Sequence, residues 1–403
     1  MTPRRIRENN PSYDQPLPPF ISTPDEIRIA VEKSAIARGV LLIKIIGKTG
    51  IENTLAILKK IVDKYDKEEM IERCFDLEIR PEALASLDSA NPPIAYPYYF
   101  SAPEMLIEYP TLVTYYRNLA MLSRKVMNGL GMNTANIENG AVPSFEAAQR
   151  FSRYFNKIVS EYILLSEVTP LRHLEIVLSN IGDGLGGVSR NEVGRLATTQ
   201  IMRYVITDLH SIKQIDSVQY TLKGSLDAIE DDEELPEIAD VWKFTDELDI
   251  STKLDTLEKY RVKYQQIILK NGYSLLLDRQ LYWSDREGNS FKIGPDLHSR
   301  NSTIDLIWAG EIKGGADPAG SDEHWKTATQ AFNRIIEAAE KTDREKPLLS
   351  FLATIIVERV AREAQQWISE GKLTSVYNLT KISENPQARR FFLDDMRRFL
   401  GID

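Results

Sequence analysis

The order of strands and helices predicted after Gly272 constrains the fold more than any other feature of the chain. Short runs in this part alternate apolar and polar residues, as half-buried strands do, and the longer runs between them repeat at helical spacing. The predicted elements are strands at 273–283, 290–293 and 303–313, a helix at 322–341, a strand at 348–357, a helix at 359–370 and a strand at 374–381, with a turn at 285–289. Elements in this order build a mixed β-sheet with helices on its faces. We therefore predict an α+β protein whose C-terminal part contains this sheet.

The N-terminal half is predicted to be mostly helical. From Thr23, a residue suited to capping a helix, apolar residues recur at helical spacing through Val62, with a break at 47–50. Further helical patterns cover 103–130, the segment that starts at Ser144, and 169–218. The aromatic residues between 96 and 100 are expected to pack at a helix corner rather than to stack on bases.

Two shifts in composition divide the chain. Residues 1–22 are rich in Pro, Arg and Asn without periodicity, which predicts a flexible arm. Eight acidic residues between Asp227 and Asp240 resist burial and predict a solvated linker or loop. The expected divisions are therefore an arm at 1–22, a helical region at 23–226, an acidic linker at 227–240 and a sheet domain at 241–403 that begins with a helix at about 251–270.

Charge and cysteine content exclude several classes of protein. A net charge of −9 argues against a protein that coats nucleic acid indiscriminately, because such binding needs Lys and Arg to neutralise phosphates, but it allows a local positive cleft. The single cysteine, Cys74, excludes an internal disulfide and a cysteine-based zinc site, which is typical of a cytoplasmic protein. No apolar run is long enough to cross a bilayer, so no membrane association is expected.

Three side chains that can carry chemistry stand at one end of the predicted sheet. Pro295-Asp296 precedes the strand that ends in Glu311-Ile312-Lys313, and strand alternation puts Glu311 and Lys313 on one face. If Asp296 lies beside them, two carboxylates and one ammonium converge. Hard oxygen ligands of this kind suit Mg²⁺, and the Ile312 carbonyl can add another.

This set of groups suits the hydrolysis of a phosphodiester. The reaction places negative charge on a five-coordinate phosphorus, and a metal ion stabilises that charge and acidifies its bound water. Lys313 would position the attacking water and offset charge near the phosphate. The spacing therefore predicts a Mg²⁺-dependent phosphodiesterase with Asp296, Glu311 and Lys313 as its catalytic residues, and Asp296, Glu311 and Ile312 as its metal ligands.

The arrangement resembles the PD-(D/E)xK nuclease superfamily over about 273–381, and the stretch from Gly310 to Ala328 resembles type II restriction endonucleases, the ApaLI-like group more than the XcyI-like group. The resemblance implies that 241–403 is a catalytic core and 23–226 serves DNA recognition or dimerisation. It also implies a homodimer that cuts both strands of double-stranded DNA at a short palindrome, GTGCAC for the ApaLI-like group. Such an enzyme leaves 5′-phosphates and works beside a cognate DNA methyltransferase.

The sequence leaves the roles of several residues near this motif undecided. Asp305 competes with Asp296 as the first metal ligand, although it leaves little room for a hairpin turn before Glu311. Lys326 and Arg334 follow the motif on the predicted helix and are candidate phosphate contacts. His324 lies beside Lys326 and either lines the cleft or belongs to a structural helix start.

Two alternative functions remain beside the nuclease. The first is a DNA-binding protein that keeps a nuclease-like sheet without catalysis, which metal-dependent cleavage would exclude. The second is a nucleotide-binding enzyme that uses the GxGxxG pattern at 182–187. Because the flanking sequence is helical rather than a strand leading into a helix, a flexible loop between helices is the expected structure there.

Overall fold

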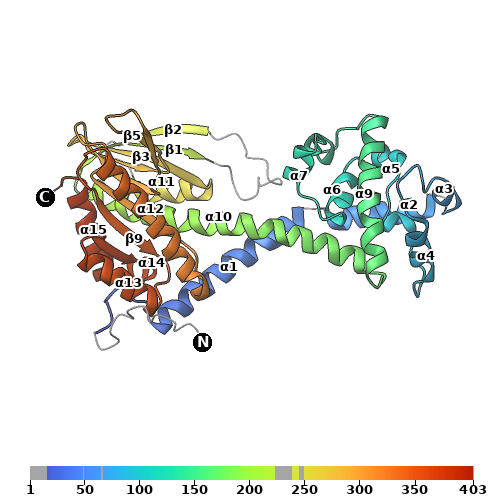
Figure 1. Ribbon diagram of the computed structural model, residues 1–403, viewed down its shortest axis with the longest axis horizontal. Helices are drawn as coiled ribbons and strands as arrows, with labels where there is room; N and C mark the ends of the chain where they lie inside the picture. The colour runs from blue at the N-terminus through green and yellow to red at the C-terminus, as the bar shows by residue number, and fades with distance from the viewer. Residues whose placement is uncertain (1–15, 49, 65–66, 223–237, 245–248, 403) are drawn as a thin grey trace, which may run out of the picture. The chain divides into compact units, whose positions relative to one another are not determined.

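The computed structural model describes residues 16–48, 50–64, 67–222, 238–244 and 249–402, and it divides into two compact units (Figure 1). Unit 1 comprises residues 1–40 and 190–403, and unit 2 comprises residues 41–189. Two helices, α1 (Pro24–Lys48) and α10 (Arg172–Ser211), contribute residues to both units. Helices and a mixed sheet make the protein α+β, as the sequence predicted.

An eight-stranded mixed sheet forms the centre of unit 1, in the order β10-β9-β8-β7-β4-β3-β1-β2. Strands β8, β9 and β10 run parallel to one another, and every other neighbouring pair is antiparallel. The strands are β1 (Ile215–Leu222), β2 (Ile238–Lys243), β3 (Val262–Leu269), β4 (Ser274–Leu277), β7 (Leu297–Arg300), β8 (Trp308–Lys313), β9 (Leu348–Ala353) and β10 (Ser375–Asn378). Strand β8 therefore lies where the antiparallel part of the sheet meets the parallel part.

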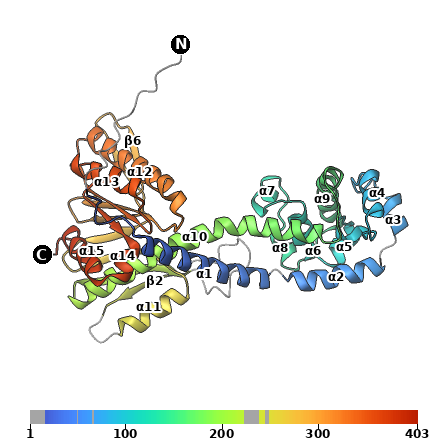
Figure 2. The same cartoon turned by 90° about the horizontal axis from the view of Figure 1, so that it is seen from below.

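Helices cover both faces of this sheet (Figures 1 and 2). One face packs against α12 (Ser321–Lys341) and α13 (Glu358–Ser369), whose apolar residues join those of β8 and β9 in one core cluster. The other face packs against α10, α11 (Ile250–Lys259) and α15 (Pro386–Phe399). Successive residues of β8 therefore enter different cores, with Ala309 facing α12 and Trp308 stacking on Phe399. A short helix, α14 (Leu379–Glu384), follows β10.

A small hairpin, β5 (Leu281–Ser284) with β6 (Ser290–Ile293), lies between β4 and β7 and packs on α12. Its alternation separates two faces, because Trp283 and Ile293 are buried whereas Tyr282 and Lys292 are exposed and opposite each other. The predicted turn at 285–289 joins the two strands. The chain leaves this hairpin through Gly294 and Pro295, directly before Asp296.

The described part of the predicted arm, residues 16–22, is ordered against unit 1. The Ser22 hydroxyl accepts a hydrogen bond from the Ile356 backbone N–H at 2.9 Å and another from Asn378 Nδ2 at 2.8 Å. Phe20 and Ile21 are partly buried against the core beside α12 and α13. The expectation of a flexible arm is wrong for these residues, since paired polar groups and buried apolar side chains hold them, and residues 1–15 lie outside the described part.

Unit 2 is built from short helices around one apolar core. Its elements are α2 (Ile51–Lys64), α3 (Lys67–Glu72), α4 (Pro81–Ser89), η1 (Tyr96–Tyr98), α5 (Pro103–Glu108), α6 (Leu112–Leu119), α7 (Arg124–Gly129), α8 (Ala135–Glu138) and α9 (Phe145–Leu165). Tyr96, Tyr99 and Phe100 are buried in this core, which confirms that these aromatic residues pack rather than present free faces. Cys74, with 5% of its surface exposed, belongs to the same core.

Several predicted elements differ from the structure. The helix predicted at 251–270 ends at Lys259, because Arg261 adopts a positive φ of 53° and the alternating residues that follow form β3. The helical pattern predicted through Val218 likewise ends at Ser211, and β1 follows. The strands predicted at 273–283 and 303–313 are shorter, since the first is split into β4 and β5 and the second begins at Trp308. The last two predicted strands end at Ala353 and Asn378, where α13 and α14 follow.

The compact units also differ from the expected divisions. Strand β1, which falls inside the expected helical region 23–226, pairs with β3 of the sheet, so unit 1 reaches back to Arg190. Most of the expected acidic linker at 227–240 lies outside the described residues, and its last three residues begin β2. The loop expected at 182–187 is wrong, because α10 runs through these residues as one helix. A GxGxxG pattern inside a helix offers no free N–H groups to a pyrophosphate, which removes the basis of the nucleotide-binding alternative.

Candidate active site at the end of strand β8

The register of β7 and β8 places Asp296 beside Glu311. Leu297 lies opposite Gly310 and His298 opposite Ala309, so the next position along this antiparallel pair sets Asp296 against Glu311 on the same face. The Ile312 backbone N–H donates a hydrogen bond to Asp296 Oδ2 at 2.7 Å, which fixes the carboxylate at the end of the strand. Two acidic side chains separated by fourteen residues are therefore neighbours.

Lys313 joins the two carboxylates. Its Nζ lies 3.1 Å from Glu311 Oε2 and 3.8 Å from Asp296 Oδ2. The exposed fraction of the side chain rises from 5% for Glu311 to 20% for Lys313 and 36% for Asp296. The trio that the sequence predicted therefore converges, with Glu311 at the buried end and Asp296 at the open end.

Burial and mutual repulsion disfavour the ionised forms of both acids. Burial raises the pKa of Glu311 to about 7, and the charge of Asp296 adds to this effect while Lys313 opposes it. Burial also raises the pKa of Asp296, against the opposing charge of Lys313. Two carboxylates that share one ammonium in a partly dry site need more positive charge before both can ionise at neutral pH.

The donor set at this position fits Mg²⁺. The N–H and C=O groups of one strand residue point to the same side, so the Ile312 carbonyl faces the side on which its N–H meets Asp296. Two carboxylates and one carbonyl suit an ion that keeps several waters and takes further oxygens from a phosphate. Within the described residues, no group of three or more His, Cys, Asp and Glu side chains is arranged to hold a metal ion, so a fully protein-coordinated site is absent there.

The loop after Lys313 brings His324 close to the site. A Cβ atom on Gly315 would lie 2.3 Å from His324 Cε1, so a side chain at this position would displace the ring. The pKa of His324 is lowered, first by burial and second by the charge of Lys313. The neutral form of the imidazole is therefore favoured beside the trio.

The other candidates lie apart from the trio. Asp305 precedes β8, is exposed, and pairs with Arg344 Nη1 at 2.9 Å, because β8 begins only at Trp308. Lys326 and Arg334 are exposed on α12, and Lys326 Nζ lies 4.0 Å from Glu323 Oε2. Of Asp296 and Asp305, the two residues considered as the first metal ligand, Asp296 is the one that lies beside Lys313 and Glu311.

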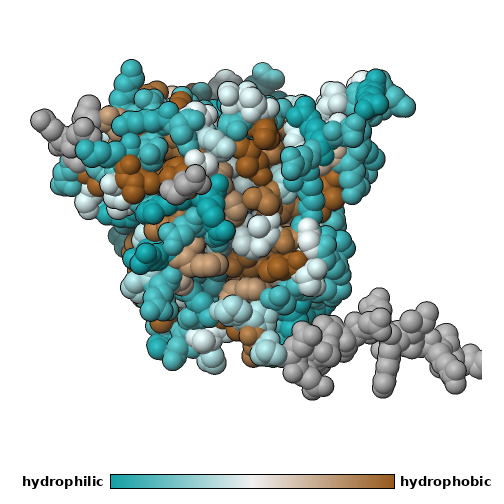
Figure 3. Space-filling model, turned by 90° about the vertical axis from the view of Figure 1, so that its left-hand side faces the viewer, coloured by the Kyte–Doolittle hydropathy of each residue, from teal (hydrophilic) through white to brown (hydrophobic). Residues whose placement is uncertain are grey.

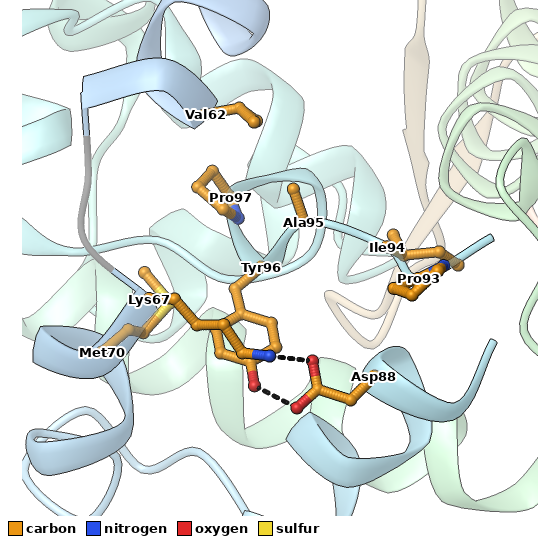
Figure 4. A pocket seen from close by; sticks show the side chains of 9 residues that line it. All are labelled: Val62, Lys67, Met70, Asp88, Pro93, Ile94, Ala95, Tyr96 and Pro97. Atoms are coloured by element: carbon orange, nitrogen blue, oxygen red, sulfur yellow. Dashed lines mark hydrogen bonds and ion pairs between the residues drawn. The ribbon is translucent and has the colours of Figure 1, made fainter. Parts of the chain in front are cut away.

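A hollow in unit 2 offers no comparable chemistry. It has a volume of about 250 Å³, and its charged groups already satisfy one another (Figure 4). The Asp88 carboxylate accepts hydrogen bonds from Lys67 Nζ at 2.6 Å and from the Tyr96 hydroxyl at 2.8 Å. The bond from Lys67 lowers the pKa of Asp88, which makes this aspartate a poor general base.

Comparison with known proteins points to restriction endonucleases. Residues 290–390 match a family described as "Restriction endonuclease BsobI", a segment that contains Asp296, Glu311 and Lys313. Over 211 residues the chain is 31% identical to the type II restriction enzyme BsoBI of Geobacillus stearothermophilus, an alignment that covers 50% of this chain and 59% of the relative. Type II restriction enzymes named AvaI, from Nostoc sp. and Anabaena variabilis, are 33% identical over 204 residues, with 50% of this chain and 58% of each relative covered. The chain therefore spans less than two thirds of the length of these relatives.

The described helices include none with the length and apolar character needed to cross a membrane. On the face of the molecule in Figure 3, hydrophobic residues form separate patches among hydrophilic ones.

Proposed function

We propose that this protein is a type II restriction endonuclease of the PD-(D/E)xK superfamily that hydrolyses double-stranded DNA with Mg²⁺. The observation that carries the proposal is the convergence of Asp296, Glu311 and Lys313 at the end of β8. The likeness of residues 290–390 to a restriction endonuclease family supports it.

Each residue of the trio has a distinct role in this proposal. Asp296 and Glu311 would hold Mg²⁺ together with the Ile312 carbonyl. The metal ion would supply charge stabilisation at the phosphorus and acidify a bound water. Lys313 orients the attacking water and offsets the charge of the scissile phosphate, since its ammonium already lies within reach of both carboxylates. The neutral ring of His324 can accept a proton at the same site.

The remaining features of the enzyme rest on the likeness to type II restriction enzymes. We propose a homodimer that cuts both strands of a short palindrome, leaves 5′-phosphates and is paired with a cognate DNA methyltransferase in the cytoplasm. Membership of the ApaLI-like group and the site GTGCAC stay predictions, and the named relatives, BsoBI and AvaI, are a second guide to the recognition sequence.

The proposal is tested by incubating the purified protein with unmethylated phage DNA in Mg²⁺ or in EDTA. We expect discrete fragments in Mg²⁺ alone, and ends that ligate without prior phosphorylation. A Lys313→Ala variant should lose cleavage by about 100- to 1000-fold. The matched control is Lys270→Ala, which removes an exposed cation at the end of β3, outside the site.

Three outcomes separate the alternatives. Cleavage lost in Lys313→Ala and kept in Lys270→Ala supports the trio. Intact DNA with every duplex, together with tight binding, favours the noncatalytic DNA-binding protein. Equal cleavage by wild type and Lys313→Ala means that the active site lies elsewhere.

A further inference from the structure

A second hollow lies beside Asp296. Its volume is about 360 Å³, and it is lined by residues of the β4–β5 turn, the end of β6, the link to β7 and helix α12. Gly294 and Pro295 form one wall, and the next residue in the chain is Asp296. The hollow and the catalytic trio therefore share a short stretch of backbone.

Two cations line this hollow without an acidic partner. No ion pair within the described part of the chain involves Lys292 or Arg334, whereas Arg286, Lys341 and Arg344 each pair with an acid. Arg334 Nε donates to the Gln330 carbonyl at 3.2 Å, which leaves the two terminal amino groups of the guanidinium free of protein acceptors in the described residues. Both side chains are exposed, so both can reach a ligand.

A neutral donor adds to the two cations. Gln280 Oε1 accepts a hydrogen bond from the Tyr282 hydroxyl at 3.1 Å, so the amide nitrogen of Gln280 is the group left for a ligand. One acid also lines the hollow, Asp278, but its Oδ2 lies 3.4 Å from Lys263 Nζ. The local charge of the hollow is therefore positive in a chain whose net charge is −9.

The lining excludes several kinds of ligand. No aromatic ring faces the hollow among the residues that line it, so a base or another flat ring has nothing to stack on. The apolar part of the lining comes from Ile293, Pro295, Ala331 and Ile335. Two cations and an amide N–H₂ group around an open hollow suit a phosphate oxygen.

We propose that this hollow binds one backbone phosphate of duplex DNA adjacent to the phosphate cut at Asp296, with Lys292, Arg334 and Gln280 as its ligands. This inference rests on the proposed nuclease function and extends it, because it assigns the positioning of the strand to residues outside the trio. A fixed neighbouring phosphate would set the register of the scissile bond against Lys313.

The test measures affinity for a short duplex that contains the mapped cleavage site, in EDTA so that no cutting occurs. The dissociation constant is followed against salt concentration, because each phosphate contact by a cation adds about one unit to the slope of log K against log salt. We expect the double change of Lys292 and Arg334 to alanine to lose about one unit of slope, because both cations hold the same phosphate, and each single change to lose part of that unit and to bind up to about tenfold more weakly at low salt. Arg334→Lys should keep the slope, and the control Lys270→Ala should behave as wild type.

A second measurement locates the contact. In a series of duplexes, one phosphate at a time beside the cleaved bond is replaced by an uncharged methylphosphonate. Wild type should lose affinity at one adjacent position, and Lys292→Ala should lose less at that position, because only Arg334 and Gln280 still hold the phosphate there. If the enzyme binds and cuts DNA but both alanine variants keep the wild-type slope, this inference is wrong and the proposed nuclease function still stands. Absence of any binding or cutting by wild type would remove the proposed function and this inference together.

Discussion

Glu138 in unit 2 and Glu311 in unit 1 are both buried, and their surroundings shift their pKa values in opposite directions. In unit 2, Glu138 is hydrogen-bonded by Arg117 Nε at 2.7 Å, by Arg124 Nε at 2.9 Å and by the Thr134 hydroxyl at 2.5 Å. These partners outweigh burial, so the pKa of Glu138 is lowered. In unit 1, Glu311 has one ammonium that it shares with Asp296, and burial raises its pKa to about 7.

The difference separates a structural charge from a reactive one. Glu138 has more positive partners than it needs, and it ties α6, α7 and α8 together through them. Glu311 has too few, so added positive charge, such as the Mg²⁺ proposed for this site, would favour its ionised form. The same residue type at similar burial thus holds a fold in one unit and a candidate active site in the other.

The largest expected effect on stability is at Glu138. The change Glu138→Gln keeps the size of the side chain but removes the buried negative charge that Arg117 and Arg124 share, and it should lower the free energy of unfolding by about 3–5 kcal/mol. Denaturant unfolding measures this, with Glu146→Gln on the exposed first turn of α9 as the control, expected to change stability by less than about 0.5 kcal/mol. A loss below about 1 kcal/mol would mean that the contacts of Glu138 with Arg117 and Arg124 do not stabilise the fold.

The matching change at Glu311 should lower the cleavage rate and leave the stability of the fold intact. Glu311→Gln removes a charge that the site disfavours, so unfolding in EDTA at pH 8 should be unchanged or slightly harder, while Mg²⁺-dependent cleavage falls by about 100- to 1000-fold. Cleavage rates and unfolding curves on the same preparation check both halves. A destabilised Glu311→Gln protein with normal cleavage would reverse the assignment of the two glutamates.

The pH dependence of stability should distinguish the two sites in metal-free protein. The folded-state pKa of Glu311 lies above its unfolded value, so the folded state binds the proton more tightly and stability falls as pH rises from about 4.5 to about 7. The contribution of Glu138 has the other sign, present above the unfolded value and lost on acidification. Glu311→Gln in EDTA should therefore lose the decline between these pH values, and an unaltered decline would contradict the raised pKa.

The smallest expected effect is at the glycine beside His324. In Gly315→Ala the new methyl group must displace the imidazole, and we expect cleavage to fall by about tenfold with little change in overall stability. The control is Gly182→Ala in α10, where a Cβ meets no atom within 4 Å and a gain of about 0.5–1 kcal/mol is expected from helix propensity. Equal cleavage by both variants and wild type would show that the position of His324 is unimportant.

The candidate site was more predictable than the sheet that carries it. Glu311 and Lys313 end an apolar run, so alternation alone put them on one face, and a Pro-Asp pair at hairpin distance supplied Asp296. Strand β7, which brings Asp296 into place, has four residues and no detectable period. Its existence depends on pairing with β4 and β8, which are long-range contacts that a local pattern does not contain.

Long-range pairing also explains why β1 was predicted as part of a helix, whereas two further errors have other causes. Strand β1 continues a helical pattern in sequence, and only its pairing with β2 and β3 makes it a strand. At 182–187 a loop was predicted where the structure has a helix. A helix of 40 residues tolerates glycines that cost about 1 kcal/mol each when good helix-forming sequence flanks them. Lys292 was missed because an exposed lysine on a short hairpin carries no signal until the hollow beside Asp296 is seen.

The buried thiol of Cys74 can report when the core of unit 2 opens. The chain has one cysteine, and it lies in the core of unit 2 with 5% of its surface exposed. A thiol reagent can modify it only when that core opens, so the labelling rate of unaltered protein counts the openings of one unit and is blind to those of the other. Kinetics of this kind, followed while DNA is added, would separate the motions of the helical unit from events at Asp296 and Glu311 without an engineered label.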